Sequence, residues 1–264
     1  EVFFRNQYLS RADMWQLMKS LEETVVYEGQ VLKYLGSAIA EVENIWISGE
    51  RKESAYVTHP YTKPIFRSRS ARYAILIEVS REMLEGWSHG ELMYERLIDG
   101  LLHELFQRWE RDKARHLASV ILYGRAAGAD GAAKRDSHNH QHGEDFYILL
   151  VSEVTSITWA DILNKIRRAF NDLTLSRSVC LAAESNILEA IHLTAMDFAD
   201  DQNDAHLMST GTSIIAVTAG TGLFNADHTL LKQTTDLLVG NSIGVDIVAL
   251  SPKPLHPVPL FRYD

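Results

Sequence analysis

The stretch YAILIEVSREM, Tyr73 to Met83, begins with a nearly continuous apolar run. Such a run is typical of a strand that is buried on both faces of a parallel sheet. Polar side chains then follow at Glu78, Ser80 and Glu82. Because open α/β sheets bind ligands beyond the carboxyl ends of their strands, these three residues stand where a site would lie.

Patterns of strands and helices alternate after this stretch, which predicts an α/β domain with a mostly parallel sheet and helices on both faces. A long polar loop, Arg125 to Gly143, joins two of the strands as a hairpin excursion rather than a helical crossover. The expected elements are a helix from about Gly90 to Asp112, the strands HLASVILYG and EDFYILLVSEV, helices opening at Thr158 and Ser185, the strand TSIIAVTAG, a helix capped by Asp227, and the strand GVDIVALS.

Three finer expectations concern helix faces and ends. In the helix after Gly90, one apolar stripe is expected to face the sheet. It consists of Met93, Leu97, Leu101, Leu105 and Trp109 at a four-residue step, with Ile98 and Leu102 beside them. Gly240-Asn241 is expected to end the helix that Asp227 begins in a left-handed turn. The proline-rich tail SPKPLHPVPLFRYD predicts an edge strand or an extended segment across the sheet.

The region before the α/β pattern is different in kind. Ser10 can cap a helix that ends near Glu23, and short β-rich runs follow, broken at Gly29, Gly36 and Ser48-Gly49. We therefore predict two parts: residues 1–65, a helix and a small β meander packed on the main domain, and residues 66–264, the α/β domain.

Composition limits the function. The 264 residues carry a formal net charge of −9 without a basic stripe, which opposes binding to nucleic acid. Cys180 is the only cysteine, so an internal disulfide is impossible and a reducing compartment is expected. No apolar run approaches the roughly 20 residues that a membrane-spanning helix needs. The chain begins at Glu1, which indicates a piece of a longer protein.

A metal site of the von Willebrand A type would use Asp-x-Ser-x-Ser after this strand, with a Thr and an Asp from later loops, because Mg²⁺ prefers oxygen ligands in octahedral geometry. This chain has Glu78, Ser80 and Glu82 instead, and the later loops offer Ser185 and Thr218. The stretch TAGTG has no acidic residue for the last ligand position. We predict no metal here, with Ser80 as a hydrogen-bonding group at the start of a helix and the glutamates solvated or paired.

Other candidate chemistry is weaker. His138, His140 and His142 alternate in a polar loop that lacks rigid flanking structure, so a solvated loop is the expected state. Cys180 has no histidine near it in sequence to generate a thiolate. The glycine-containing turns TAGTGLF and YGRAAGADG lack phosphate-binding spacing. We therefore predict no catalytic residue, no cofactor and no metal, and a role in binding.

Several stretches together resemble one family, the DEP-domain-bearing subunit of the GATOR-one complex, also called SEACIT (the Iml-one family). They run in the family's order along the whole chain. They are RADMWQLMKSL (Arg11 to Leu21), FRSRSA (Phe66 to Ala71), VSREM (Val79 to Met83), LMYERLIDGLLHELFQRW (Leu92 to Trp109), NILEAIHL (Asn186 to Leu193), TAGTGLFNAD (Thr218 to Asp227) and GVDIVALSPKPLHPVPLFRY (Gly244 to Tyr263).

The resemblance implies a region containing the SABA domain, which is similar to the von Willebrand A fold, at the cytosolic face of the vacuolar or lysosomal membrane. It implies a non-catalytic scaffold in a GTPase-activating complex for Rag GTPases, which restrains TOR signalling when amino acids are scarce. The expected partners are the nitrogen-permease-regulator-like subunits, one of which supplies the catalytic arginine, and the Rag GTPases through the whole complex. The surfaces that bind each partner stay unassigned.

The chain departs from the family at three places. The family often shows Trp-Glu-Phe-Asp after SREM, where this chain has Leu84, Glu85, Gly86 and Trp87. The segments Gly128 to Gly143 and Thr174 to Ala183 look short for the family.

Two alternatives remain beside the scaffold. The first is a metal-dependent ligand-binding domain of the von Willebrand A type, which rests on Glu78 and Ser80. The second is a hydrolase in which Cys180 or Ser80 attacks the substrate.

Overall fold

The structure is a computed structural model, and it describes residues 1–5, 9, 11–34, 38–66, 71–85, 90–126, 144–155, 159–176, 178–200, 211–256 and 260–263. The chain divides near Ala71 into two compact units. The loop histidines, Ser10, Gly36, Thr158 and the segment Gly128 to Gly143 lie outside the described residues.

The first unit is a small β structure with one helix. Its main sheet has the strand order β3-β4-β1-β7, with β5 paired to β4, and β2 and β6 form a separate ribbon. The elements are β1 (Val2–Arg5), α1 (Arg11–Leu21), β2 (Val25–Tyr27), β3 (Val31–Tyr34), β4 (Ala38–Ile47), β5 (Glu50–Lys52), β6 (Ser54–Tyr56) and β7 (Pro64–Phe66).

The helix and the meander are present, but the first strand was missed. β1 lies before the helix, pairing antiparallel with β4 and parallel with β7. Its partners are about 40 and 60 residues away along the chain, so no local turn signal indicates it. β7 includes both sides of the predicted boundary between residues 65 and 66, and it belongs to the first unit. The expected turn at Ser48-Gly49 is confirmed, with φ values of 51° and 83°.

The second unit contains a five-stranded sheet with the order β10-β9-β8-β11-β13. β8 pairs parallel with β9 and β11 pairs parallel with β13, whereas β10 forms the expected antiparallel hairpin with β9. The strands are β8 (Arg72–Glu78), β9 (Leu117–Arg125), β10 (Asp145–Val154), β11 (Thr212–Thr218) and β13 (Gly244–Ala249).

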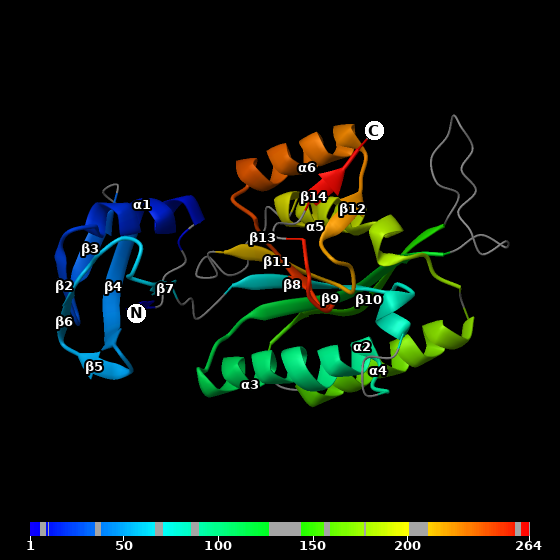
Figure 1. The fold of residues 1–264 in the computed structure, drawn as a ribbon, viewed down its shortest axis with the longest axis horizontal. Coiled ribbons are helices and arrows are strands. Elements are labelled where there is room, and N and C mark those ends of the chain that lie inside the picture. Colours follow the sequence, from blue (N-terminus) through cyan, green and yellow to red (C-terminus); the bar gives the residue numbers. More distant parts are fainter. Residues whose placement is uncertain are drawn as a thin grey trace. The chain divides into compact units, whose positions relative to one another are not determined.

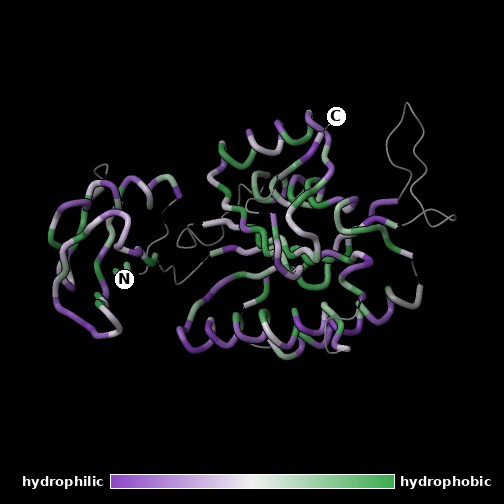
Figure 2. The backbone as a smooth tube through the Cα atoms, viewed as in Figure 1, coloured by the Kyte–Doolittle hydropathy of each residue, from purple (hydrophilic) through white to green (hydrophobic). Residues whose placement is uncertain are grey.

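Helices cover both faces of this sheet, as predicted (Figure 1). One layer contains α2 (Met93–Arg96), α3 (His103–Arg111) and α4 (Trp159–Ser176), and the other contains α5 (Ile187–Asp200) and α6 (His228–Gly240). In Figure 2 the strands between the two layers are largely hydrophobic, and the outer turns of α3 are hydrophilic. None of the helices in the described residues is long and apolar enough to cross a membrane.

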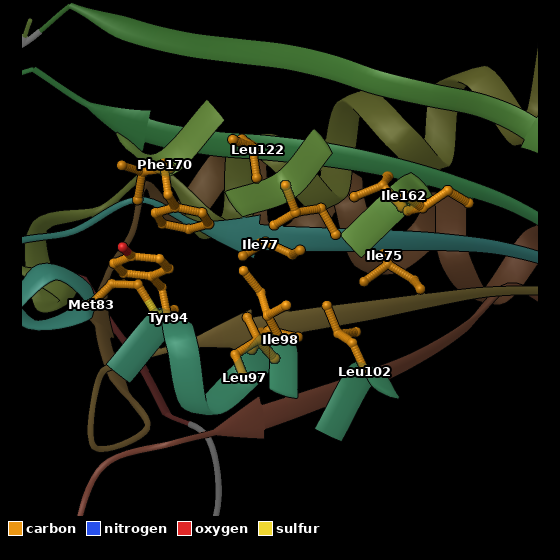
Figure 3. Close-up of a cluster of buried hydrophobic side chains, with 14 of the residues drawn as sticks. Ile75, Ile77, Met83, Tyr94, Leu97, Ile98, Leu102, Leu122, Ile162 and Phe170 are labelled. Atoms are coloured by element: carbon orange, nitrogen blue, oxygen red, sulfur yellow. The ribbon is translucent and has the colours of Figure 1, made fainter. Parts of the chain in front are cut away.

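Each helical layer encloses its own hydrophobic core. Ile75 and Ile77 of β8 point toward α2–α4, while Ala74 and Leu76 pack against α5 and α6, so successive residues of one strand serve opposite cores. Figure 3 shows the first core, where the rings of Phe170 and Tyr94 stack with centroids 4.9 Å apart. This alternation explains why the strand reads as one continuous apolar run.

The predicted stripe on the helix after Gly90 is wrong at Leu101, which is 39% exposed. A four-residue step drifts by about 40° per step around a helix of 3.6 residues per turn, so a long stripe of this kind leaves the core. The chain is also in a π-helix from Leu97 to Leu102 between α2 and α3. The rest of the prediction holds for burial: Met93, Leu97 and Trp109 of the stripe are buried, and so are Ile98 and Leu102 beside it. Phe106 is a buried residue that the prediction left out.

Asp227 caps α6 as the sequence predicts: its carboxylate accepts a hydrogen bond of 2.7 Å from the Leu230 amide. We expect Asp227→Ala to lower the free energy of unfolding by about 1 kcal/mol, because one amide at the helix start loses its acceptor. Chemical denaturation measures the change, and Asp227→Asn, which keeps an acceptor, is the control. Equal losses for both variants would contradict the capping role.

Two expectations need correction, one about the end of α6 and one about the C-terminal tail. The left-handed residue after α6 is Ser242, with φ of 54°, whereas Asn241 has φ of −104°. The tail forms β14 (Leu260–Arg262), which pairs parallel with β12 (Leu223–Asn225) in a two-stranded sheet and does not join the main one. A proline-rich run predicts extended backbone without indicating its partner strand.

Candidate functional site

Two neighbouring strands of the main sheet end side by side at its carboxyl edge. β8 ends at Glu78 and β11 ends at Thr218, and both residues are fully buried. Ser80 follows β8 and is 1% exposed. The residues that the sequence placed after the first strand therefore meet the end of β11, as the parallel arrangement requires.

The Glu78 carboxylate joins these strand ends through one oxygen. Oε2 of Glu78 accepts hydrogen bonds of 3.0 Å from the Ser80 hydroxyl, the Thr218 hydroxyl and the Ala219 amide. The Thr218 hydroxyl in turn accepts a bond of 2.9 Å from the Gly220 amide. One carboxyl group thus holds β8 and the turn after β11 together.

Burial changes the acidity of this carboxyl group. It raises the pKa of Glu78 to about 7, an effect that the three hydrogen-bond donors oppose and that the nearby negative charge of Glu82 reinforces. Oε1 of Glu78 is buried and has no hydrogen-bond partner. The Tyr123 hydroxyl, also buried, has a pKa raised well above its usual value by burial and by Glu78.

The residues at this edge do not fit Mg²⁺. This ion needs about six oxygen ligands in octahedral geometry and usually keeps several waters. Glu78 Oε2 is already surrounded by three donors, and the residues around it are closed to solvent. Within the described ranges, no three His, Cys, Asp or Glu residues are grouped so that they could hold a metal ion.

Two of the residues considered for the metal site do not take part in the hydrogen bonds around Glu78. Oε2 of Glu82 accepts a hydrogen bond of 2.8 Å from the Ala182 amide. The Ser185 hydroxyl is buried and has no partner, and it does not open α5 as predicted, because the first helical bond runs from the Ala190 amide to the Asn186 carbonyl at 3.0 Å. Among these candidates, hydrogen bonds in the described structure therefore join Glu78, Ser80 and Thr218.

The two candidate nucleophiles are poorly placed for catalysis. Burial raises the pKa of the Cys180 thiol, which disfavours the reactive thiolate. The Ser80 hydroxyl donates its hydrogen bond to a buried carboxyl group, Glu78, inside a closed site. These contacts disfavour the hydrolase alternative.

A second polar cluster was not predicted from the sequence. Nε of Arg125, at the end of β9, lies 2.6 Å from Oδ1 of Asp145, and its Nη2 lies 3.4 Å from Oε1 of Glu189. Nη1 also donates a bond of 3.0 Å to the Glu184 carbonyl. Arg125 and Asp145 are directly opposite in the β9–β10 hairpin. The register of the β9–β10 hairpin pairs these two residues, but the long polar loop between the strands gives no sequence signal for that register.

Comparison with protein families covers both units. The vWA-like domain of the vacuolar membrane-associated protein Iml1 matches residues 70–263, and the IML1 small domain matches residues 1–68. The chain is 35% identical over 311 residues to the vacuolar membrane-associated protein IML1 of Pyricularia oryzae, and 37% identical over 309 residues to iml1 of Aspergillus terreus. Each alignment covers 100% of this chain but only 16% and 17% of the two relatives.

A solved structure with some likeness is the SpRpn10 VWA domain. It is 14% identical, with a TM-score of 0.37, and the alignment covers 70% of this chain and 89% of that one.

Proposed function

The chain belongs to the family of the vacuolar membrane-associated protein Iml1, and from this premise we propose that it is a non-catalytic scaffold that docks other subunits of a protein complex. The complex is a GTPase-activating complex for Rag GTPases, which restrains TOR signalling during amino-acid starvation. The docked subunits are the nitrogen-permease-regulator-like proteins. The scaffold associates peripherally with the cytosolic face of the vacuolar or lysosomal membrane.

The observation that carries this proposal is the closed carboxyl edge of the sheet. Domains of this class use that edge for ligands, but here Ser80 and Thr218 donate hydrogen bonds to Glu78, and all three residues are sealed from solvent. The alternative of a metal-dependent ligand-binding domain is disfavoured by the same contacts. Binding by other surfaces then becomes the expected function.

The small domain offers one such surface. Val25 and Tyr27 of β2 and Tyr56 of β6 lie on the outer face of the ribbon, and each is more than half exposed, with values of 59%, 54% and 56%. Val26, between the first two, is fully buried in the core. Exposed tyrosines of this kind are common at the centres of protein interfaces.

The full-length protein here means the complete Iml1-family protein that carries this chain. We expect it to co-purify with the regulator-like subunits, and we expect a variant from which residues 1–264 of this chain are deleted to lose them. Rag GTP hydrolysis should accelerate with the complex and stay at its basal rate with the full-length protein alone. Gel filtration checks that the deleted variant remains soluble and unaggregated. Unchanged assembly after the deletion, or acceleration by the full-length protein alone, would refute the scaffold role.

A further inference from the structure

The outer strand of the main sheet exposes apolar side chains. In the described part of the chain, β10 is paired on one side only, to β9. Tyr147 and Leu149 of β10 are 38% and 60% exposed. They lie opposite Tyr123 and Ile121, which pack toward α5, so all four side chains share that face of the sheet.

Helix α5 adds two apolar side chains beside this strand. Leu193 and Met196 are 48% and 43% exposed. They follow Glu189 by four and seven residues, a spacing that places all three on one side of a helix. The sheet-facing side of α5 carries Ile187, Ile191 and Ala195. Leu193 and Met196 therefore lie on the outer side of the helix, and Glu189 on this side contacts Arg125 of β9.

Two arginines link β10 and α5 at opposite ends. At one end Arg125 contacts Asp145 of β10 and Glu189 of α5. At the other end Arg72 pairs with Glu153 of β10 and lies 5.1 Å from the ring centroid of Phe198 of α5. The strand and the helix therefore run side by side in the same direction.

The four apolar residues fall at the same level along this pair. Leu149 lies about 13 Å beyond Asp145 at 3.3 Å per strand residue, and Met196 lies about 10 Å beyond Glu189 at 1.5 Å per helix residue. We call Tyr147, Leu149, Leu193 and Met196 the β10–α5 patch.

The charged residues that are exposed to solvent around the β10–α5 patch are acidic. Glu144 and Asp197 are exposed, and the side chain of Glu153 is 46% exposed. The two arginines at its ends are largely covered, with side chains 15% and 11% exposed, and both are in ion pairs. A partner that brings Lys or Arg beside aliphatic side chains would complement this surface.

The backbone of β10 supplies the third feature. Residues 145 to 149 pair with β9 in unbroken register, and the register shifts only after Leu149. The outer edge of such a stretch presents N–H and C=O groups to a further strand. Strand addition gives affinity through the backbone and specificity through alternate side chains.

We propose that β10 accepts an extended, basic segment of a docked subunit as an additional strand, whose aliphatic side chains pack on the β10–α5 patch. The inference rests on the proposed function, because it takes a regulator-like subunit as the source of the segment. It adds the place of contact, the geometry of binding and the chemistry of the partner.

The test uses the full-length protein purified with the regulator-like subunits. We expect Leu149→Lys combined with Met196→Lys to weaken binding of the subunits by about tenfold or more, which corresponds to roughly 1.4 kcal/mol, and so to reduce the amount recovered. The control is Val239→Lys on α6, where the native side chain is 75% exposed and distant from β10, and recovery should not change. Melting temperatures of both variants should match that of the unsubstituted protein.

Hydrogen exchange identifies the geometry of binding. Amides of residues 145, 147 and 149 should exchange more slowly in the complex than in the full-length protein alone, because they point away from β9, whereas the amides of residues 146 and 148 point toward it. Slow exchange of these three outward amides in the protein alone would mean that its own chain covers the edge, and it would overturn the proposal. Unchanged exchange, or full recovery with the double variant, would also overturn it while leaving the scaffold role intact, whereas failure of the unsubstituted protein to bind any subunit would remove the scaffold role itself.

Discussion

Phe170→Ala should lower the free energy of unfolding of this chain by about 3–5 kcal/mol, the range found when a buried phenylalanine is truncated. Phe170 is fully buried, and its ring stacks on Tyr94 at 4.9 Å with an interplanar angle of 4°. It joins α4 to the helix that begins with α2, so its removal leaves a cavity that neither helix can fill alone (Figure 3). Urea denaturation followed by circular dichroism measures the loss.

Tyr94→Phe is the matched control for this change. It keeps the stacked ring and removes only the hydroxyl, which donates a hydrogen bond of 3.0 Å to Oδ1 of Asn171. We expect a loss of about 1 kcal/mol, because a single side-chain hydrogen bond contributes roughly that much. A loss for Phe170→Ala no greater than that of the control would contradict the packing argument.

The parallel sheet could be predicted because its local patterns agree with its tertiary contacts. The run from Tyr73 to Ile77 is apolar on both faces, and residues 74 to 77 are buried on both faces. Sequence patterns did not predict the strand whose pairing partners are distant along the chain. β1 is four residues long, and only its pairing with β4 and β7 makes it a strand.

The candidate site could be predicted only in part. Topology alone places Glu78, Ser80 and Thr218 at one edge, since the strands that carry them are neighbours. It could not predict that Glu82 binds the Ala182 amide, because this depends on how the loops fold over the edge. The Arg125 cluster was missed because the sequence does not fix the register of the β9–β10 hairpin, and because Glu189 comes from a third element, α5.

The stability of this chain should depend on pH through Glu78. Its pKa is about 7 in the folded state against an ordinary value of 4.5, so between these values the folded state binds more protons than the unfolded state. The stabilisation from this group is therefore complete below pH 4.5 and is lost as the pH rises through 7. The total change is about 3 kcal/mol, since one pKa unit corresponds to about 1.4 kcal/mol.

His116 changes the free energy of unfolding with pH in the opposite direction, so its contribution must be distinguished from that of Glu78. Burial lowers the pKa of His116 to about 4 from 6.5. This group therefore makes the folded state more stable as the pH rises through that interval. The unfolding profile of the unsubstituted chain therefore combines two opposed slopes. Glu78→Gln removes only the first of them, because glutamine keeps an oxygen acceptor for Ser80, Thr218 and Ala219 but does not titrate.

The decisive quantity is the difference in unfolding free energy between the unsubstituted chain and Glu78→Gln, measured by urea denaturation from pH 5 to pH 8. We expect the unsubstituted chain to lose about 3 kcal/mol relative to the variant over the whole titration, because its ionised carboxylate remains in a buried site near the negative charge of Glu82. Parallel profiles would show that Glu78 titrates normally. That result would require an open, hydrated edge, and it would also remove the physical reason for excluding a ligand there.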